Sequence, residues 1–171
     1  MKKIIIALLM SLPVISYGQA LQKELTGVMG HNEQQILALA EAIPDDKYGW
    51  APEEGVRSVS GVLLHLASAN YFFLSSMGFE LPQGVDMKKI ESITGKKEVI
   101  ETVKKSFAYA KEKIPMITDK ALDEKFKTPF GEFSKRSGIL IMLDHSGEHK
   151  GQLIAYARMN GITPPWSKKE E

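Results

Sequence analysis

Residues 137–160 read SGILIMLDHSGEHKGQLIAYARMN, and this stretch decides the fold. Side chains separated by steps of four, four, three, four and three residues are Ile141, His145, His149, Gln152, Tyr156 and Met159. Such steps bring side chains to one face of an α-helix. Gly161 and the prolines just beyond it are typical of a helix end. The stretch therefore predicts a helix whose inward face carries two histidines one turn apart.

Three other stretches, residues 21–43, 58–77 and 96–117, repeat apolar residues with the same helical period. The inward side chains expected of the first are Leu21, Leu25, Val28, Ile36, Leu39 and Ile43, with Asn32 as a polar member. Ser58 is a candidate cap for the start of the second helix, and Pro115 is expected to bend the third helix or to stop it early. Alternating aromatic residues in residues 126–135 predict a short hairpin or an extended loop. The predicted fold class is all-α, a four-helix bundle with long connections.

A third histidine, His65, interrupts the apolar stripe of the second predicted helix. The other side chains of that stripe are Val62, Leu66, Ala69, Phe72 and Phe73. Buried imidazoles without partners cost about 1–3 kcal/mol each, and a divalent ion shared by His65, His145 and His149 would offset this cost. Closed structural sites use four protein ligands, so three indicate a site for chemistry or ligand binding. The alternative is hydrogen-bonded core histidines in a metal-free interaction protein.

The composition limits the partners. The chain has no cysteine, which excludes disulfides, thiolate zinc sites and a cysteine nucleophile, so nitrogen and oxygen must bind any metal. The formal charge of +1 gives no reason to expect nucleic acid or an anionic membrane. We expect a small-molecule ligand or substrate.

The first 18 residues have the layout of a secretory signal peptide, with a basic start, an apolar run over residues 4–15 and a small-residue end. The run is shorter than the ~20 residues of a membrane span. We expect cleavage after Gly18, with Ala20 as the alternative. Residues 19–171 would then form one mature domain without a membrane span, located in the periplasm or secreted.

The fourth histidine and three glycines have other expected places. His31 lies about 110° from the centre of the first helix's apolar stripe, which predicts a boundary or surface position. Gly61 lies one turn before His65 and is expected to leave room for a ligand. Gly147 and Gly151 project away from the histidines and are expected to permit close helix packing, within the chain or across a dimer.

Residues 145–149 also spell H-x-x-E-H, the signature of inverzincin metalloproteases. Those proteases take a ligand glutamate from far downstream, whereas only Glu170 and Glu171 remain here, in a charged tail. We therefore reject a protease. Glu148 lies roughly 60° from His145 around the helix, and two roles stay open for it: orienting a ligand, or a solvated charge beside the stripe.

Four segments resemble the DinB-like (damage-inducible) superfamily of metal-binding four-helix bundles, which includes YfiT-type proteins. They are Trp50-Ala51-Pro52, Arg57-Ser58-Val59 leading to Leu64-His65-Leu66, Asp144-His145 to His149-Lys150-Gly151-Gln152-Leu153, and Tyr156 to Pro165. The resemblance implies an up-down-down-up bundle, frequent homodimers and a divalent metal, commonly zinc or nickel. The implied ligands are His65, His145 and His149.

The resemblance leaves the activity open, because some relatives are thiol-dependent transferases or isomerases and others were proposed to be hydrolases. We expect a metal-dependent hydrolase of a small molecule, since a divalent ion on three imidazoles polarises carbonyl groups and activates water. Candidates for a catalytic or ligand-orienting role are Glu148, Gln152 and Asn32. The alternatives are a non-catalytic module for metal and a small ligand, and a thiol-dependent transferase, which export makes less favourable.

Two expectations concern the surroundings of the site. Tyr71 and Arg57 are expected at its entrance, and residues 126–135 are expected to cover the pocket.

Overall fold

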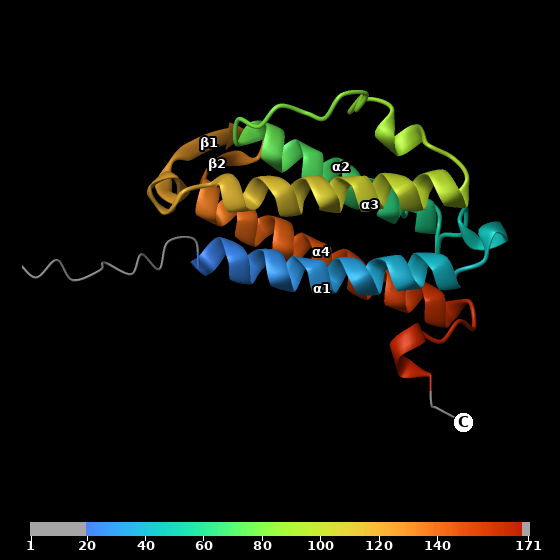
Figure 1. Ribbon diagram of the computed structural model, residues 1–171. Coiled ribbons are helices and arrows are strands. Elements are labelled where there is room, and N and C mark those ends of the chain that lie inside the picture. The colour runs from blue at the N-terminus through green and yellow to red at the C-terminus, as the bar shows by residue number, and fades with distance from the viewer. Residues whose placement is uncertain (1–19, 169–171) are drawn as a thin grey trace, which may run out of the picture.

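The computed structural model describes residues 20–168, which form four long helices and one β-hairpin (Figure 1). The helices are α1 (Ala20–Ala42), α2 (Val59–Ser76), α3 (Lys96–Lys113) and α4 (Lys135–Met159), and the strands are β1 (Lys125–Thr128) and β2 (Gly131–Ser134). The connections contain short 3-10 turns, η1 (Asp45–Lys47), η2 (Ile90–Ser92), η3 (Ile114–Met116), η4 (Asp119–Asp123) and η5 (Pro165–Ser167). The predicted four-helix bundle is confirmed. The predicted signal peptide, residues 1–18, lies outside the described residues.

The helices surround one core in the order α1, α3, α2, α4, because α3 and α4 each pack against both α1 and α2. In Figure 1, α1 and α4 run in one direction and α2 and α3 in the other, which is the up-down-down-up arrangement. Since α2 and α3 are parallel neighbours, residues 77–95 must return along the length of the bundle before α3 can begin. This long connection carries η2 past α2, where it reaches the histidines.

Hydrogen bonds and proline set the helix ends. The hydroxyl of Ser58 accepts the backbone N–H of Gly61 at 3.1 Å and caps α2, as the sequence predicts. Ser134 caps α4 in the same way, so that helix begins two residues before the predicted Ser137. Pro115 stops α3 at Lys113, and the chain continues as the 3-10 turn η3.

The core lies between the four helices and is mainly aliphatic. Two predicted core positions are wrong. Val28 is 51% exposed, because Met29 occupies the inward position between Leu25 and Asn32. Met159 is 63% exposed, because α4 ends there. None of the described helices is both long enough and apolar enough to cross a membrane.

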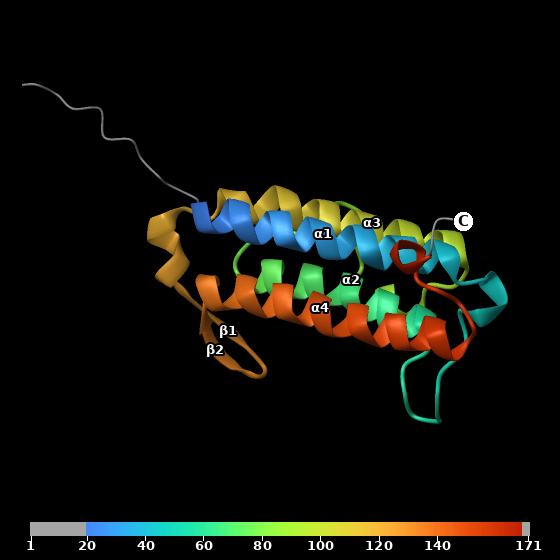
Figure 2. The same ribbon diagram turned by 90° about the horizontal axis from the view of Figure 1, so that it is seen from below.

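The hairpin packs beside the start of α4 (Figure 2). Phe126 pairs with Phe133 across the two strands, and its buried ring lies over Gly138. A Cβ at Gly138 would meet this ring at 2.8 Å and would also meet the methyl group of Met77. The hairpin predicted for residues 126–135 is therefore confirmed, and a glycine in α4 makes room for it.

Gly147 and Gly151, the other glycines of α4, were expected to permit close helix packing, but unlike Gly138 they have no close neighbour within the described chain. A Cβ at Gly147 would meet Asn32 of α1 at an ordinary 3.9 Å, and a Cβ at Gly151 would meet nothing within 4 Å. Within the described chain, close packing therefore requires a glycine at neither position.

Candidate metal centre

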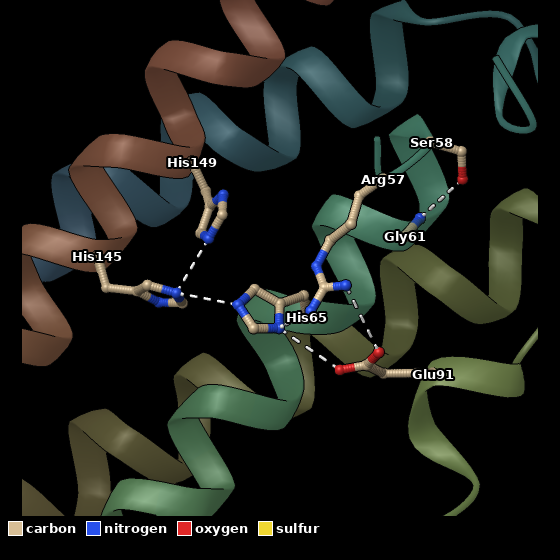
Figure 3. Close-up of polar contacts among 7 residues, drawn as sticks. All are labelled: Arg57, Ser58, Gly61, His65, Glu91, His145 and His149. Carbon is tan, nitrogen blue, oxygen red and sulfur yellow. Dashed lines mark hydrogen bonds and ion pairs between the residues drawn. The ribbon is translucent and has the colours of Figure 1, made fainter. Parts of the chain in front are cut away.

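Three histidines meet between α2 and α4. His65 lies in the middle of α2, and His145 and His149 lie one turn apart on α4. All three side chains are half-buried, and their rings point toward one another (Figure 3). Within residues 20–168, no other group of at least three histidine, aspartate or glutamate side chains has its ligand atoms close enough together to bind one metal ion.

The facing atoms are the Nε2 nitrogens. Nε2 of His145 is 3.2 Å from Nε2 of His65 and 2.9 Å from Nε2 of His149. Imidazole nitrogens bind zinc at about 2.0–2.1 Å, so two ligands at angles of roughly 90–110° are about 2.9–3.4 Å apart. Both separations from His145 therefore match neighbouring ligands on one ion, and the ligand atoms of all three histidines lie within 4.8 Å of one another.

A chain of hydrogen bonds orients His149. The backbone carbonyl of Arg57 can only accept, so the hydroxyl of Tyr156 donates to it at 3.0 Å. That hydroxyl accepts from Nε2 of Gln152 at 2.8 Å, which leaves Oε1 of Gln152 to accept from Nδ1 of His149 at 2.7 Å. The rings of Trp50 and Tyr156 pack edge to face, with their centroids 5.3 Å apart. With its proton on Nδ1, His149 directs the lone pair of Nε2 at the cluster.

Nδ1 of His65 lies between a cation and a carboxylate (Figure 3). It is 3.0 Å from Nη2 of Arg57 and 3.4 Å from Oε1 of Glu91. A guanidinium only donates and a carboxylate only accepts, so the two contacts require opposite tautomers of His65. Metal binding through Nε2 requires the proton on Nδ1, where it is donated to Glu91. Glu91 therefore favours metal binding, and Arg57 opposes it.

The surroundings keep two of the rings neutral. The pKa of His145 is lowered from its ordinary 6.5 to about 4, mainly by burial and also by the neighbouring His149 and His65. Burial also lowers the pKa of His65, with the charge of Arg57 as the second cause. Because metals bind the neutral imidazole, both rings are in the required form at neutral pH.

The three residues predicted to assist the histidines lie in different places. Gln152 contacts His149 directly. Asn32 is buried between α1 and α4, where it donates to Oγ of Ser146 at 2.9 Å and accepts from Nζ of Lys150 at 2.7 Å. The Glu148 carboxylate is exposed and has no hydrogen bond or ion pair with a described residue. Only Gln152 of this group touches the cluster.

Of the other residues expected near the site, some lie beside the histidines and others do not. Arg57 lies beside the histidines, whereas Tyr71 is buried with its ring 5.5 Å from that of Tyr109 and does not line the histidine pocket. A Cβ at Gly61 would lie 3.5 Å from Cβ of Arg57, so the space predicted there for a ligand contains the arginine side chain. His31 is exposed on α1.

Glu91 is the site residue that the sequence analysis missed. It belongs to η2, 26 residues from His65, and no helical period connects it with the histidine pattern. The usable signal was the length of the connection, because a segment that returns along the bundle must pass over the face of α2.

A pocket of about 350 Å³ opens onto the cluster and is lined by His65 and His145 but not by His149. Phe130, in the turn of the hairpin, also lines it. The hairpin was expected to cover the pocket, and its turn forms one wall.

Fold and site together define a class of protein, a four-helix bundle with three convergent imidazoles between its second and fourth helices. The model of the DinB family matches residues 19–170, and the chain belongs to this family. No functionally curated protein matches the chain.

Solved structures share the fold at low sequence identity. The DinB-like protein YjoA from Bacillus subtilis is 18% identical, with 86% of this chain and 99% of that chain covered and a TM-score of 0.67. A DinB-like protein from Bacillus cereus is 18% identical, with 84% and 95% covered and a TM-score of 0.62. YfiT from Bacillus subtilis is 16% identical, with 89% and 94% covered and a TM-score of 0.67, and is described as "a probable metal-dependent hydrolase with an unusual four-helix bundle topology".

Proposed function

We propose that this DinB-family protein binds one divalent ion, zinc or nickel, through His65, His145 and His149 and hydrolyses a small molecule. The observation that carries the proposal is the set of three facing Nε2 atoms, 2.9 and 3.2 Å apart along the cluster. The description of YfiT as a probable metal-dependent hydrolase supports the same reading.

The chain's own side chains have distinct parts in this proposal. An ion bound there supplies a Lewis acid, which polarises a carbonyl group and activates water. Gln152 orients His149, and Glu91 accepts the Nδ1 proton of His65. Hydrolysis adds water across the scissile bond: the carbonyl carbon gains a hydroxyl group, and the leaving group gains a proton. Among the described residues, Glu91 is also the one carboxylate that lines the pocket, so it could contact a substrate there.

The first test is metal content. Protein purified without a histidine tag is expected to contain about one divalent ion per chain by elemental analysis. His145→Ala should lose the ion, and His31→Ala, which changes an exposed histidine outside the cluster, should keep it. A wild type that contains no metal and does not bind added zinc or nickel would show that the histidines are core residues, and the proposal would fail.

The second test separates an enzyme from a binding module. Loaded wild type and His145→Ala are compared on small esters and amides, with and without a chelator. An enzyme should show turnover that the chelator abolishes and added metal restores. A fully loaded protein that turns over none of them would favour the non-catalytic module, and turnover only with added thiol would favour the transferase.

We further propose that the protein is exported, on the support of the sequence pattern of residues 1–18 alone. The N-terminus of the protein in a periplasmic or secreted fraction should then begin at Gln19. An intact Met1 in the cytoplasmic fraction would contradict this. Homodimer formation stays a prediction, which light scattering of the purified protein tests.

A further inference from the structure

The pocket beside the histidines is mainly apolar. Its volume of about 350 Å³ lies in the lower part of the range for small-molecule sites. Four segments that are distant in sequence contribute its apolar side chains, which are Ala69, Phe72, Phe73, Met87, Phe130 and Ile141. Such a wall favours the burial of hydrocarbon.

The polar groups of the pocket lie together. Besides His65 and His145, they are Ser68, which follows His65 by one helical turn, and Glu91, which contacts His65. The pocket therefore has a polar end at the three histidines, and its remaining wall is apolar.

Phe130 is the most exposed part of this wall. Its side chain is 75% exposed in the hairpin turn, and its ring lies 5.9 Å from that of Phe72, which is itself half-buried. Ile141 and Ala69 are also only half-buried. Apolar surface around a pocket marks a place where a ligand can remove it from water.

We propose that this pocket takes the hydrocarbon part of the ligand, an aliphatic chain or an aryl ring, whose single polar group faces the histidines. The substrate class is thus a small amphiphile, such as an acyl or aryl ester or amide. An apolar wall does not suit a sugar, a phosphate ester or a peptide. The orientation of the polar group rests on the proposed metal site, whereas the apolar subsite depends only on the side chains named above.

The test measures how affinity changes with chain length. Binding of acetohydroxamate, butanohydroxamate, hexanohydroxamate and octanohydroxamate to the zinc-loaded protein is measured by calorimetry. The dissociation constant should fall about threefold to fourfold for each added methylene until the pocket is full. The same protein without metal is titrated with the alcohols from butanol to octanol by methyl NMR, where Ala69, Met87 and Ile141 should shift and the longer alcohols should bind more tightly.

Two variants locate the effect. Phe130→Ala should weaken the binding of octanohydroxamate about threefold to tenfold and leave that of acetohydroxamate unchanged. Because Phe130 is exposed, its replacement should leave the fold intact. Trp166→Ala is the matched control, because Trp166 is an exposed aromatic residue that does not line the pocket.

The measurements of metal binding and of chain-length dependence test the metal site and the apolar subsite separately. Metal binding with equal affinity for short and long hydroxamates would overturn the apolar subsite and leave the metal site intact. Absence of metal binding with retained dependence on alcohol length would support the subsite and overturn the metal proposal. Chain-length dependence that Phe130→Ala leaves intact would also count against the assignment to this pocket.

Discussion

At the scale of single residues, the site depends on which partner holds Nδ1 of His65. Glu91 and Arg57 both reach this atom, at 3.4 and 3.0 Å, and they favour opposite tautomers. The positive charge of Arg57 also opposes a divalent cation nearby. Two substitutions that each replace a charged side chain with an uncharged one should therefore change metal affinity in opposite directions.

Glu91→Gln should weaken zinc binding about tenfold to a hundredfold, because it removes the carboxylate that accepts the His65 proton. Arg57→Leu should strengthen zinc binding, because leucine has neither the competing N–H donor nor the positive charge. Both dissociation constants can be measured by competition with a chromophoric chelator at neutral pH. Weaker binding in both variants would show that Arg57 supports the ligand geometry, contrary to the tautomer argument.

At the scale of elements, α4 performs three packing tasks on different faces. His145 and His149 face α2, Gly138 receives the hairpin ring of Phe126, and Lys150 reaches Asn32 of α1. Because each face has a different neighbour, α4 carries polar, small and apolar residues together. These faces also predict that two glycines of the same helix respond to alanine with opposite signs.

Gly138→Ala should destabilise the protein by about 1–3 kcal/mol, because the new methyl group would overlap the ring of Phe126. Gly151→Ala should stabilise it by up to about 1 kcal/mol, because its Cβ meets nothing within 4 Å and alanine favours the helix. Urea unfolding measures both changes in the free energy of unfolding, provided that its dependence on urea concentration is the same in wild type and variants. If Gly151→Ala instead destabilises the protein, Gly151 has a contact outside the single chain, as a dimer would provide.

At the scale of the whole molecule, the buried imidazoles couple folding to pH. The folded, metal-free protein keeps His145 neutral down to a pKa of about 4, whereas the unfolded chain takes up this proton near pH 6.5. Stability should therefore be greatest above pH 6.5 and fall between pH 6.5 and 4, by roughly 1–3 kcal/mol for this group. The lowered pKa of His65 acts in the same direction.

Thermal melting of the metal-free protein between pH 7.5 and 4 tests this linkage. His145→Gln removes the titrating ring, so its melting temperature should fall less steeply with acid than that of the wild type. Carboxylates titrate in both proteins, and the difference between the two curves isolates the histidine. Parallel curves would contradict the buried, neutral state of His145.

A metal ion bound at the proposed site should stabilise the whole molecule, because it would join α2 to α4 and would bind only the folded state. At a free concentration of a hundred times the dissociation constant, the gain is about 2.7 kcal/mol, and the melting temperature should rise by several degrees. The melting temperatures of the wild type and of His65→Ala, with and without added zinc, measure this stabilisation. An equal rise in both would indicate zinc binding outside the cluster.

The sequence alone determined the bundle and the three candidate ligands. Helical periods of three and four residues place His145 and His149 on one face whatever the rest of the chain does, and the same period places His65 on the face of another helix. The capping hydroxyl of Ser58 and the stop at Pro115 are equally local and were predicted for the same reason.

Only the tertiary structure decided what surrounds those ligands. Glu91 reaches His65 from a connection without regular period, Phe130 reaches the pocket from a hairpin turn, and Asn32 turns out to join two helices. Periodicity fixes the direction of a side chain about its own helix axis, but it says nothing of which segment lies opposite. That choice depends on the order of the helices around the core and on the path of residues 77–95, which the packing of the whole chain sets.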